Sequence, residues 1–235
     1  SHFLADHGHT VTWWTSSFDH FRKKYIFTHD SVVEINKNLT IRFLYGGGYK
    51  KNVSLARIFD HQKIASKFSS YINQENAKPD IILCSLPTIE LCRASVQYSC
   101  KNKVPVILDM RDMWPDIFPD SVPAFFRPVA QLFSRSMKRT VREACAKATA
   151  ITGITEPFVN WGLNYANRKR TTLDKAFPMG YVSSIPDEDK LRSARAFWDA
   201  KGVGDKDARF NVCFMGTLGD TLDIDSMIHA ATKIH

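Results

Sequence analysis

Short apolar runs alternate along this chain with stretches whose apolar residues recur at helical spacing, and this alternation most constrains the fold. Extended segments are expected at 10–15, 39–45, 79–85, 104–110, 149–155 and 175–181, and helices at 54–74, 88–102, 123–147 and from 156 onward. Several of the expected strands are apolar along their whole length, which is typical of strands buried on both faces. The sequence therefore predicts an α/β fold in which helices cover both faces of a parallel, Rossmann-like sheet.

The character of the sequence changes near Ser183, which suggests a domain boundary. Residues 1–183 form the expected first domain, 184–209 read as a polar and charged linker, and 210–235 read as a strand, a glycine-containing turn and a helix that open a second Rossmann-like domain. The chain starts without Met and ends within a helical pattern, so we expect a fragment cut at both ends. In that interpretation the first strand of the first domain is missing and the second domain is truncated.

Charge and cysteine content narrow the classes of function. A net charge of +8 suits an anionic partner, although a solvated basic surface explains it equally well. The basic loops lack the pattern of exposed aromatics expected of a nucleic-acid binder, so no nucleic-acid partner is predicted. No apolar run approaches the roughly 20 residues that span a bilayer. The five cysteines show no metal-ligand spacing and are expected to be free, buried thiols in a reducing cytosol, with Cys84 and Cys213 inside strand patterns.

Ligands of open α/β sheets bind beyond the carboxyl ends of the strands, so the loops after the strands are the candidate site. These loops suit a phosphorylated, hydroxyl-rich ligand. The alternative for the glycine-rich loop YGGGYKKN is a flexible turn with solvated lysines. The predicted substrate-binding residues in these loops are Lys23, Lys24, Gly47, Gly48, Tyr49, Lys50, Thr152 and Thr155.

The second expected domain offers a weaker candidate. The backbone amides of the turn that contains Gly216, Thr217 and Leu218 are predicted to bind phosphate at the start of a helix. Asp223 and Asp225 match a short metal-binding pattern, but a helix cap and a first-turn acid explain them better, so no metal is expected.

The helix expected at 123–147 carries apolar residues on one side and a basic remainder. It is predicted either to meet an anionic membrane through Phe125 and Phe126 or to pack on the sheet with a solvated basic face. Its apolar side is expected to hold Phe125, Phe126, Val129, Leu132, Phe133 and Met137.

Four segments in order resemble bacterial glycosyltransferases of family 4, which have the two-domain GT-B fold: LADHGHTVTWWTSSFDH, PDIILCSLPTIEL, VPVILDMRDMWPD and FMGTLGDTLDIDSMIHAA. The likeness is greatest to enzymes of O-antigen, capsule and colanic-acid assembly, including the fucosamine-transferase-like group. It implies retaining transfer of a sugar from a UDP- or GDP-linked donor to a lipid-linked or saccharide acceptor, without a cofactor or metal. It also implies a cytoplasmic enzyme that is peripheral on the inner face of the plasma membrane.

The stretch DMRDMWPD is the most specific part of the resemblance. The resemblance implies that Asp109 and Trp114 bind substrate and that Arg111 and Asp112 are catalytic, since guanidinium and carboxylate groups make directional bonds to phosphate and sugar hydroxyls. The alternative is that Asp109 and Arg111 form a buried pair while Trp114 and Pro115 cover the strand end. The donor-binding basic residue and acidic element of the family are expected after His235, so this chain alone is predicted to be inactive. The competing hypothesis is a non-catalytic sugar- or lipid-phosphate-binding module of the same fold.

Overall fold

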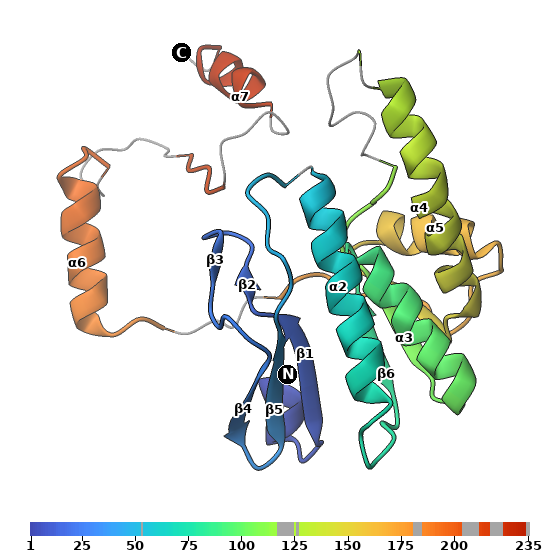
Figure 1. The fold of residues 1–235 in the computed structure, drawn as a ribbon. Helices are drawn as coiled ribbons and strands as arrows, with labels where there is room; N and C mark the ends of the chain where they lie inside the picture. The colour runs from blue at the N-terminus through green and yellow to red at the C-terminus, as the bar shows by residue number, and fades with distance from the viewer. Residues whose placement is uncertain are drawn as a thin grey trace. The chain divides into compact units, whose positions relative to one another are not determined.

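The computed structural model describes residues 1–52, 54–116, 125, 127–180, 185–203, 212–216 and 223–233. The chain divides into two compact units, Ser1–Gly180 and Tyr181–His235, and each is described by itself. The first unit contains all the described strands and the helices that cover them (Figure 1).

The first sheet of the Ser1–Gly180 unit is mixed. It has the order β1-β5-β4, with β1 (Val11–Ser16) parallel to β5 (Leu39–Leu44) and β4 (Ser31–Asn36) antiparallel to β5. The strands β1 and β5 were predicted, but β4 was not, and the expectation of parallel strands throughout is wrong for this sheet. The segment Ser31–Asn36 turns back through Lys37 and Asn38, and this hairpin connection requires antiparallel pairing.

The second sheet confirms the predicted parallel architecture. Its four strands run in the order β6-β7-β8-β9, and every neighbouring pair is parallel. The strands are β6 (Ile82–Ser85), β7 (Val106–Met110), β8 (Ala150–Gly153) and β9 (Lys175–Ala176). Helices connect β6 to β7, β7 to β8 and β8 to β9, as parallel pairing requires. An α/β, Rossmann-like arrangement is therefore present.

Four helices bury the apolar faces of these sheets. They are α2 (Leu55–Ile72), α3 (Ile89–Asn102), α4 (Arg127–Lys147) and α5 (Glu156–Ala166). The central strand β7 is almost fully buried, and Leu108 and Met110 belong to a cluster that also includes Val141 of α4 and Val159 of α5. A second cluster lies under α2 and α3, where Phe68 meets Trp14 of β1 edge to face at 5.4 Å between ring centroids. The remaining elements of this unit are α1 (His2–Asp6) and the short hairpin of β2 (Phe18–Asp19) and β3 (Lys24–Tyr25).

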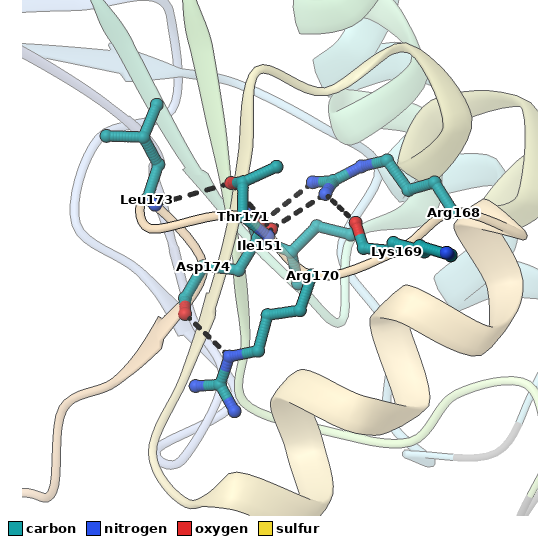
Figure 2. Close-up of polar contacts among 7 residues, drawn as sticks. All are labelled: Ile151, Arg168, Lys169, Arg170, Thr171, Leu173 and Asp174. Atoms are coloured by element: carbon teal, nitrogen blue, oxygen red, sulfur yellow. Dashed lines mark hydrogen bonds and ion pairs between the residues drawn. The ribbon is translucent and has the colours of Figure 1, made fainter.

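A buried ion pair joins the ends of β8 and β9 to the loop after α5 (Figure 2). Asp174 has a fully buried side chain and accepts two hydrogen bonds from the guanidinium of Arg168, both at 2.7 Å. It also accepts from the amide of Ile151 at 2.8 Å and from the amide and hydroxyl of Thr171. Burial alone raises the pKa of Asp174, but the bonds from Arg168, Thr171 and Ile151 outweigh it and hold the pKa well below the usual value. The cluster thus fixes the register of two neighbouring strands.

The Tyr181–His235 unit contains α6 (Glu188–Asp199) and α7 (Ile224–Ala231). The predicted strand at the start of the second domain is not present over the described residues 212–216, although the helix after it is. A strand needs a partner for its backbone groups, and the described part of this unit contains no other strand. Cys213 is consequently exposed, as is Cys100, so the expectation of buried thiols holds only for Cys84, Cys92 and Cys145.

None of the described helices is both long and apolar enough to cross a membrane. The described residues contain no group of three or more His, Cys, Asp or Glu side chains placed to hold a metal ion.

Candidate functional site

The stretch DMRDMWPD leaves the end of β7, and its first acid joins three neighbouring strands. Asp109 is buried and accepts hydrogen bonds from Thr152 of β8 at 3.0 Å and from Ser85 of β6 at 3.3 Å. The Nε of Arg111 also donates to it, at 2.5 Å. Both carboxylate oxygens of Asp109 are thus engaged within the fold. The alternative hypothesis expected a buried pair of Asp109 and Arg111; the pair is present, but its arginine is half-exposed. Substrate binding by Asp109 and Thr152 stays a prediction.

The two predicted catalytic residues differ in their surroundings. The side chain of Arg111 is 54% exposed and reaches solvent at the carboxyl edge of the sheet. Asp112 is half-buried, and burial raises the pKa of its carboxyl, while the Met113 amide and Arg57 act in the opposite direction. A carboxyl group with a raised pKa at a strand end is a common feature of functional sites. Of the three acids in this stretch, Asp112 is therefore the best placed to meet a ligand.

The end of the stretch is anchored to two helices. Asp116 accepts hydrogen bonds from Trp161 at 2.7 Å and from Tyr165 at 2.8 Å, both on α5, and pairs with Lys138 of α4 at 2.8 Å. Burial raises its pKa, but these three partners outweigh burial and lower it. The anchoring of Asp116 therefore holds the short segment that carries Trp114.

A buried acid on α2 binds the glycine-rich loop that follows β5. Asp60 of α2 accepts hydrogen bonds from the amides of Gly47 at 2.8 Å and Gly48 at 2.7 Å. A Cβ on Gly46 would lie only 2.0 Å from the same carboxylate oxygen, and Gly48 has a φ of +63°, so both positions require glycine. The amides of Gly47 and Gly48 were predicted to face substrate phosphate. In this conformation they bind Asp60 instead, so the glycines shape the loop.

A cleft lies at the carboxyl ends of β5, β6 and β7. It is partly open to solvent, and its enclosed volume is only about 20 Å³, room for about one water molecule and well below that of a small-molecule site. It is lined by Asn52, Ser54, Arg57, Ile58, His61, Pro87, Glu90, Trp114 and Met137. Of these residues, only Trp114 was predicted from the sequence to bind substrate.

Arg57 lies at the centre of this cleft, in the first turn of α2. Its guanidinium is over the ring of Trp114, 5.2 Å from the centroid, and over the ring of Tyr49 at 5.7 Å. Its Nη1 also donates to the backbone oxygen of Asn52 at 2.9 Å. Arg57 thus links the glycine-rich loop to DMRDMWPD through two aromatic rings.

One wall of the cleft carries a histidine, His61 of α2, and an acid, Glu90 of α3. His61 Nδ1 lies 3.8 Å from Glu90 Oε2. Burial, with smaller contributions from Arg57 and His20, lowers the pKa of His61 to about 4, so the ring is neutral near pH 7. Burial raises the pKa of Glu90, and Arg57 partly opposes this. The hydrogen-bonding groups of this wall suit the hydroxyls of a sugar.

The basic loop after β1 approaches the same cleft. His20 Nδ1 lies 2.7 Å from the hydroxyl of Tyr49, and Lys23 Nζ lies 4.7 Å from the centroid of the Tyr49 ring. Lys23 also donates to the side-chain oxygen of Asn52. The structure therefore brings the predicted Lys23 and Tyr49 together, and adds His20, Asn52 and Arg57.

Other predicted site residues lie apart from these contacts. Lys24, Lys50 and Thr155 are exposed, and none of them lines the cleft. Gly216 belongs to the Tyr181–His235 unit, while Thr217 and Leu218 lie outside the described residues. Asp223 caps α7 by accepting from the amide of Ser226 at 3.0 Å, as the sequence indicated.

The predicted membrane-facing turn is exposed where it is described. Phe125 is 86% exposed and Leu132, on α4, is 65% exposed, whereas Met137 packs against the core. Phe126 and the side chains of Val129 and Phe133 lie outside the description. Among the described side chains of α4, those that are buried are the smaller Ala130, Ser134, Val141, Ala144 and Cys145. Leu132 is exposed, so the expected apolar side is wrong at this position.

No family model matches the chain, and no curated protein matches it significantly. The functional interpretation therefore depends on the cleft and on the resemblance of the sequence segments.

Proposed function

We propose that this chain is part of a retaining, GT-B type glycosyltransferase that takes sugar from a UDP- or GDP-linked donor to a lipid-linked or saccharide acceptor in bacterial surface polysaccharide synthesis. The observation that supports this most is the composition of the cleft at the carboxyl ends of β5, β6 and β7. Arg57, Glu90 and Trp114 line it, and Asp112 is near enough to Arg57 for the guanidinium to act on its pKa, so carboxylates, a guanidinium and an aromatic ring are available. These groups hold sugars through directional hydrogen bonds and apolar contact.

Each side chain has a distinct part in this proposal. Asp112 and Glu90 orient sugar hydroxyls, and Arg111, whose guanidinium reaches solvent beside them, stabilises the charge of the leaving phosphate. Arg57 holds Tyr49 and Trp114 in place. The segment of Gly216, Thr217 and Leu218 is proposed to bind donor phosphate, and neither a cofactor nor a metal is proposed.

The membrane contact of the proposal involves α4. Phe125 and Leu132 present apolar side chains to solvent, and Arg127 and Arg135 are exposed on the same helix or at its start. Exposed apolar groups next to cations suit the anionic surface of a bilayer. The enzyme is accordingly proposed to be cytoplasmic and peripheral on the inner face of the plasma membrane.

The test is sugar transfer by the native protein, expressed from its gene and supplied with membrane lipid extract and a panel of UDP- and GDP-sugars. We expect Asp112→Asn, Glu90→Gln and Arg111→Ala each to lower kcat/KM at least tenfold, because each removes a charge-assisted hydrogen bond of about 1.5–3 kcal/mol. Asp189→Asn is the matched control, since it removes one charge from an exposed position on α6. Normal transfer by all three site variants would refute the site.

A second candidate is a non-catalytic module that binds sugar or lipid phosphate. The clustering of His20, Lys23 and Arg57 around Tyr49 favours it, since this cluster needs no donor chemistry. Ligand binding by the native protein, with no transfer from any donor of the panel, would support this function over the first.

A further inference from the structure

Three basic side chains surround the ring of Tyr49, which is buried. His20 contacts the hydroxyl at 2.7 Å, Lys23 Nζ lies 4.7 Å from the ring centroid, and Arg57 lies 5.7 Å from it. Asn52 joins two of them, because its side-chain oxygen accepts from Lys23 and its backbone oxygen accepts from Arg57. His20 and Lys23 come from the β2–β3 hairpin and Arg57 comes from α2, so the tertiary structure holds them together.

No carboxylate neutralises this cluster within the described part of the chain. Neither Lys23 nor Arg57 has a carboxylate oxygen within 4 Å among those residues. Two acids near the cluster bind backbone amides: Asp19 accepts from Phe21 and Arg22, and Asp60 accepts from the glycine loop. The charge of Arg57 also opposes the rise that burial causes in the pKa of Glu90 and Asp112, but neither carboxylate forms an ion pair with it. The pKa of His20 is lowered, first by burial and then by the charges of Lys23 and Arg57. Basic side chains that form no direct ion pair favour an anion.

The backbone at Lys23 supports a functional role. Lys23 has a φ of +55°, in the left-handed region that non-glycine residues rarely adopt. This conformation belongs to the turn in which the Lys23 amide donates to the oxygen of Asp19 at 2.8 Å, and it accompanies the placement of the ammonium group over Tyr49. Strained residues of this kind cluster at ligand-binding sites.

We propose that His20, Lys23 and Arg57, gathered around Tyr49 with Asn52, form a binding site for a phosphate or diphosphate group, and that this group belongs to the lipid-linked acceptor. Arg57 supplies the forked donors that match phosphate oxygens, and Lys23 supplies a mobile point charge. Phe21, next to His20 on the β2–β3 hairpin, is 92% exposed and offers an apolar contact to the lipid chain. The acceptor assignment rests on the proposed function, whereas the anion site does not.

The experiment is calorimetric titration of the native protein with four probes: inorganic pyrophosphate, geranyl diphosphate, UDP and GDP. We expect Arg57→Ala and Lys23→Ala each to weaken pyrophosphate binding about tenfold or more, because each loses a charge-assisted contact. Arg57→Lys should recover only part of the loss, since lysine lacks the planar fork. Arg195→Ala, an exposed position on α6, removes the same charge elsewhere and should bind as wild type. Circular dichroism checks that each variant is folded.

The outcomes separate the possibilities. Geranyl diphosphate binding more tightly than pyrophosphate, UDP and GDP supports the acceptor assignment. Tighter binding of UDP or GDP with the same loss in Arg57→Ala keeps the anion site but overturns the acceptor assignment. Absence of pyrophosphate binding by wild type, or equal weakening in Arg195→Ala, overturns the site itself. Sugar transfer is not part of this readout, so failure of the proposed function would appear separately, as anion binding without transfer.

Discussion

The Asp174–Arg168 pair permits a prediction of stability whose size follows from the structure. Asp174→Asn keeps the shape of the side chain but removes the charge that receives the guanidinium of Arg168 and the groups of Thr171 and Ile151 (Figure 2). Breaking a buried pair by changing one partner costs about 3–5 kcal/mol. Because the Arg168 side chain is 23% exposed, water relieves part of this cost, and we expect the free energy of unfolding to fall by about 3 kcal/mol.

Calorimetry and urea unfolding measure this change. For a unit of the size of Ser1–Gly180, 3 kcal/mol corresponds to a fall in Tm of about 6–12 °C. The pKa of Asp174 is lowered in the folded state, so its contribution is fully present above the unfolded pKa of about 3.9. This stabilising contribution is lost as the pH falls through the pKa of Asp174 in the folded state. The gap between wild type and Asp174→Asn should therefore be constant from pH 7 to about 5 and shrink below about pH 4.

Glu156→Gln is the matched control. It removes the same charge from an ion pair with Arg170, but the side chain of Glu156 is 54% exposed, so no measurable change in Tm is expected. The reasoning is refuted if Asp174→Asn unfolds within about 1 kcal/mol of wild type, well below the cost of a broken buried pair. It is also refuted if the gap between the two proteins widens as the pH falls.

Three further predictions concern the loops and surfaces. Gly46→Ala should lower the free energy of unfolding by about 1–3 kcal/mol in urea titration, because its Cβ meets the carboxylate of Asp60; an unchanged midpoint would contradict this close approach. Asp116→Asn should increase amide hydrogen exchange in the segment that carries Trp114, because it weakens the contacts with α4 and α5. Exchange is measured by mass spectrometry, and an unchanged rate would contradict this prediction. Phe125→Ser with Leu132→Ser should reduce cosedimentation with vesicles that contain phosphatidylglycerol but leave Tm unchanged, since both side chains are exposed; equal binding by variant and wild type would exclude this surface.

The sequence predicted the strands and helices wherever periodicity is strong. The runs that became β1, β5, β6, β7 and β8 and the helices α2, α3, α4 and α5 were placed correctly, because burial of one or both faces leaves a clear pattern of apolar residues. It failed at β4 and at the β2–β3 hairpin. Those strands are short or half-exposed, so their composition is close to that of a loop. It also predicted a strand before Gly216, but a strand forms only where a neighbour satisfies its backbone.

The residues of the cleft were likewise predicted only in part from the sequence. The sequence alone pointed to the strand-end loops, because parallel sheets place their carboxyl ends at one edge, and it singled out Lys23, Tyr49 and Asp112. It could not show that Asp109 is bound to neighbouring strands, or that Asp60 binds the amides of the glycine loop. Arg57, His61 and Glu90 lie on ordinary amphipathic helices, where nothing local distinguishes a charged residue that faces a cleft from one that faces water. Only tertiary packing decides which helix face meets which loop, and that packing created the basic cluster around Tyr49.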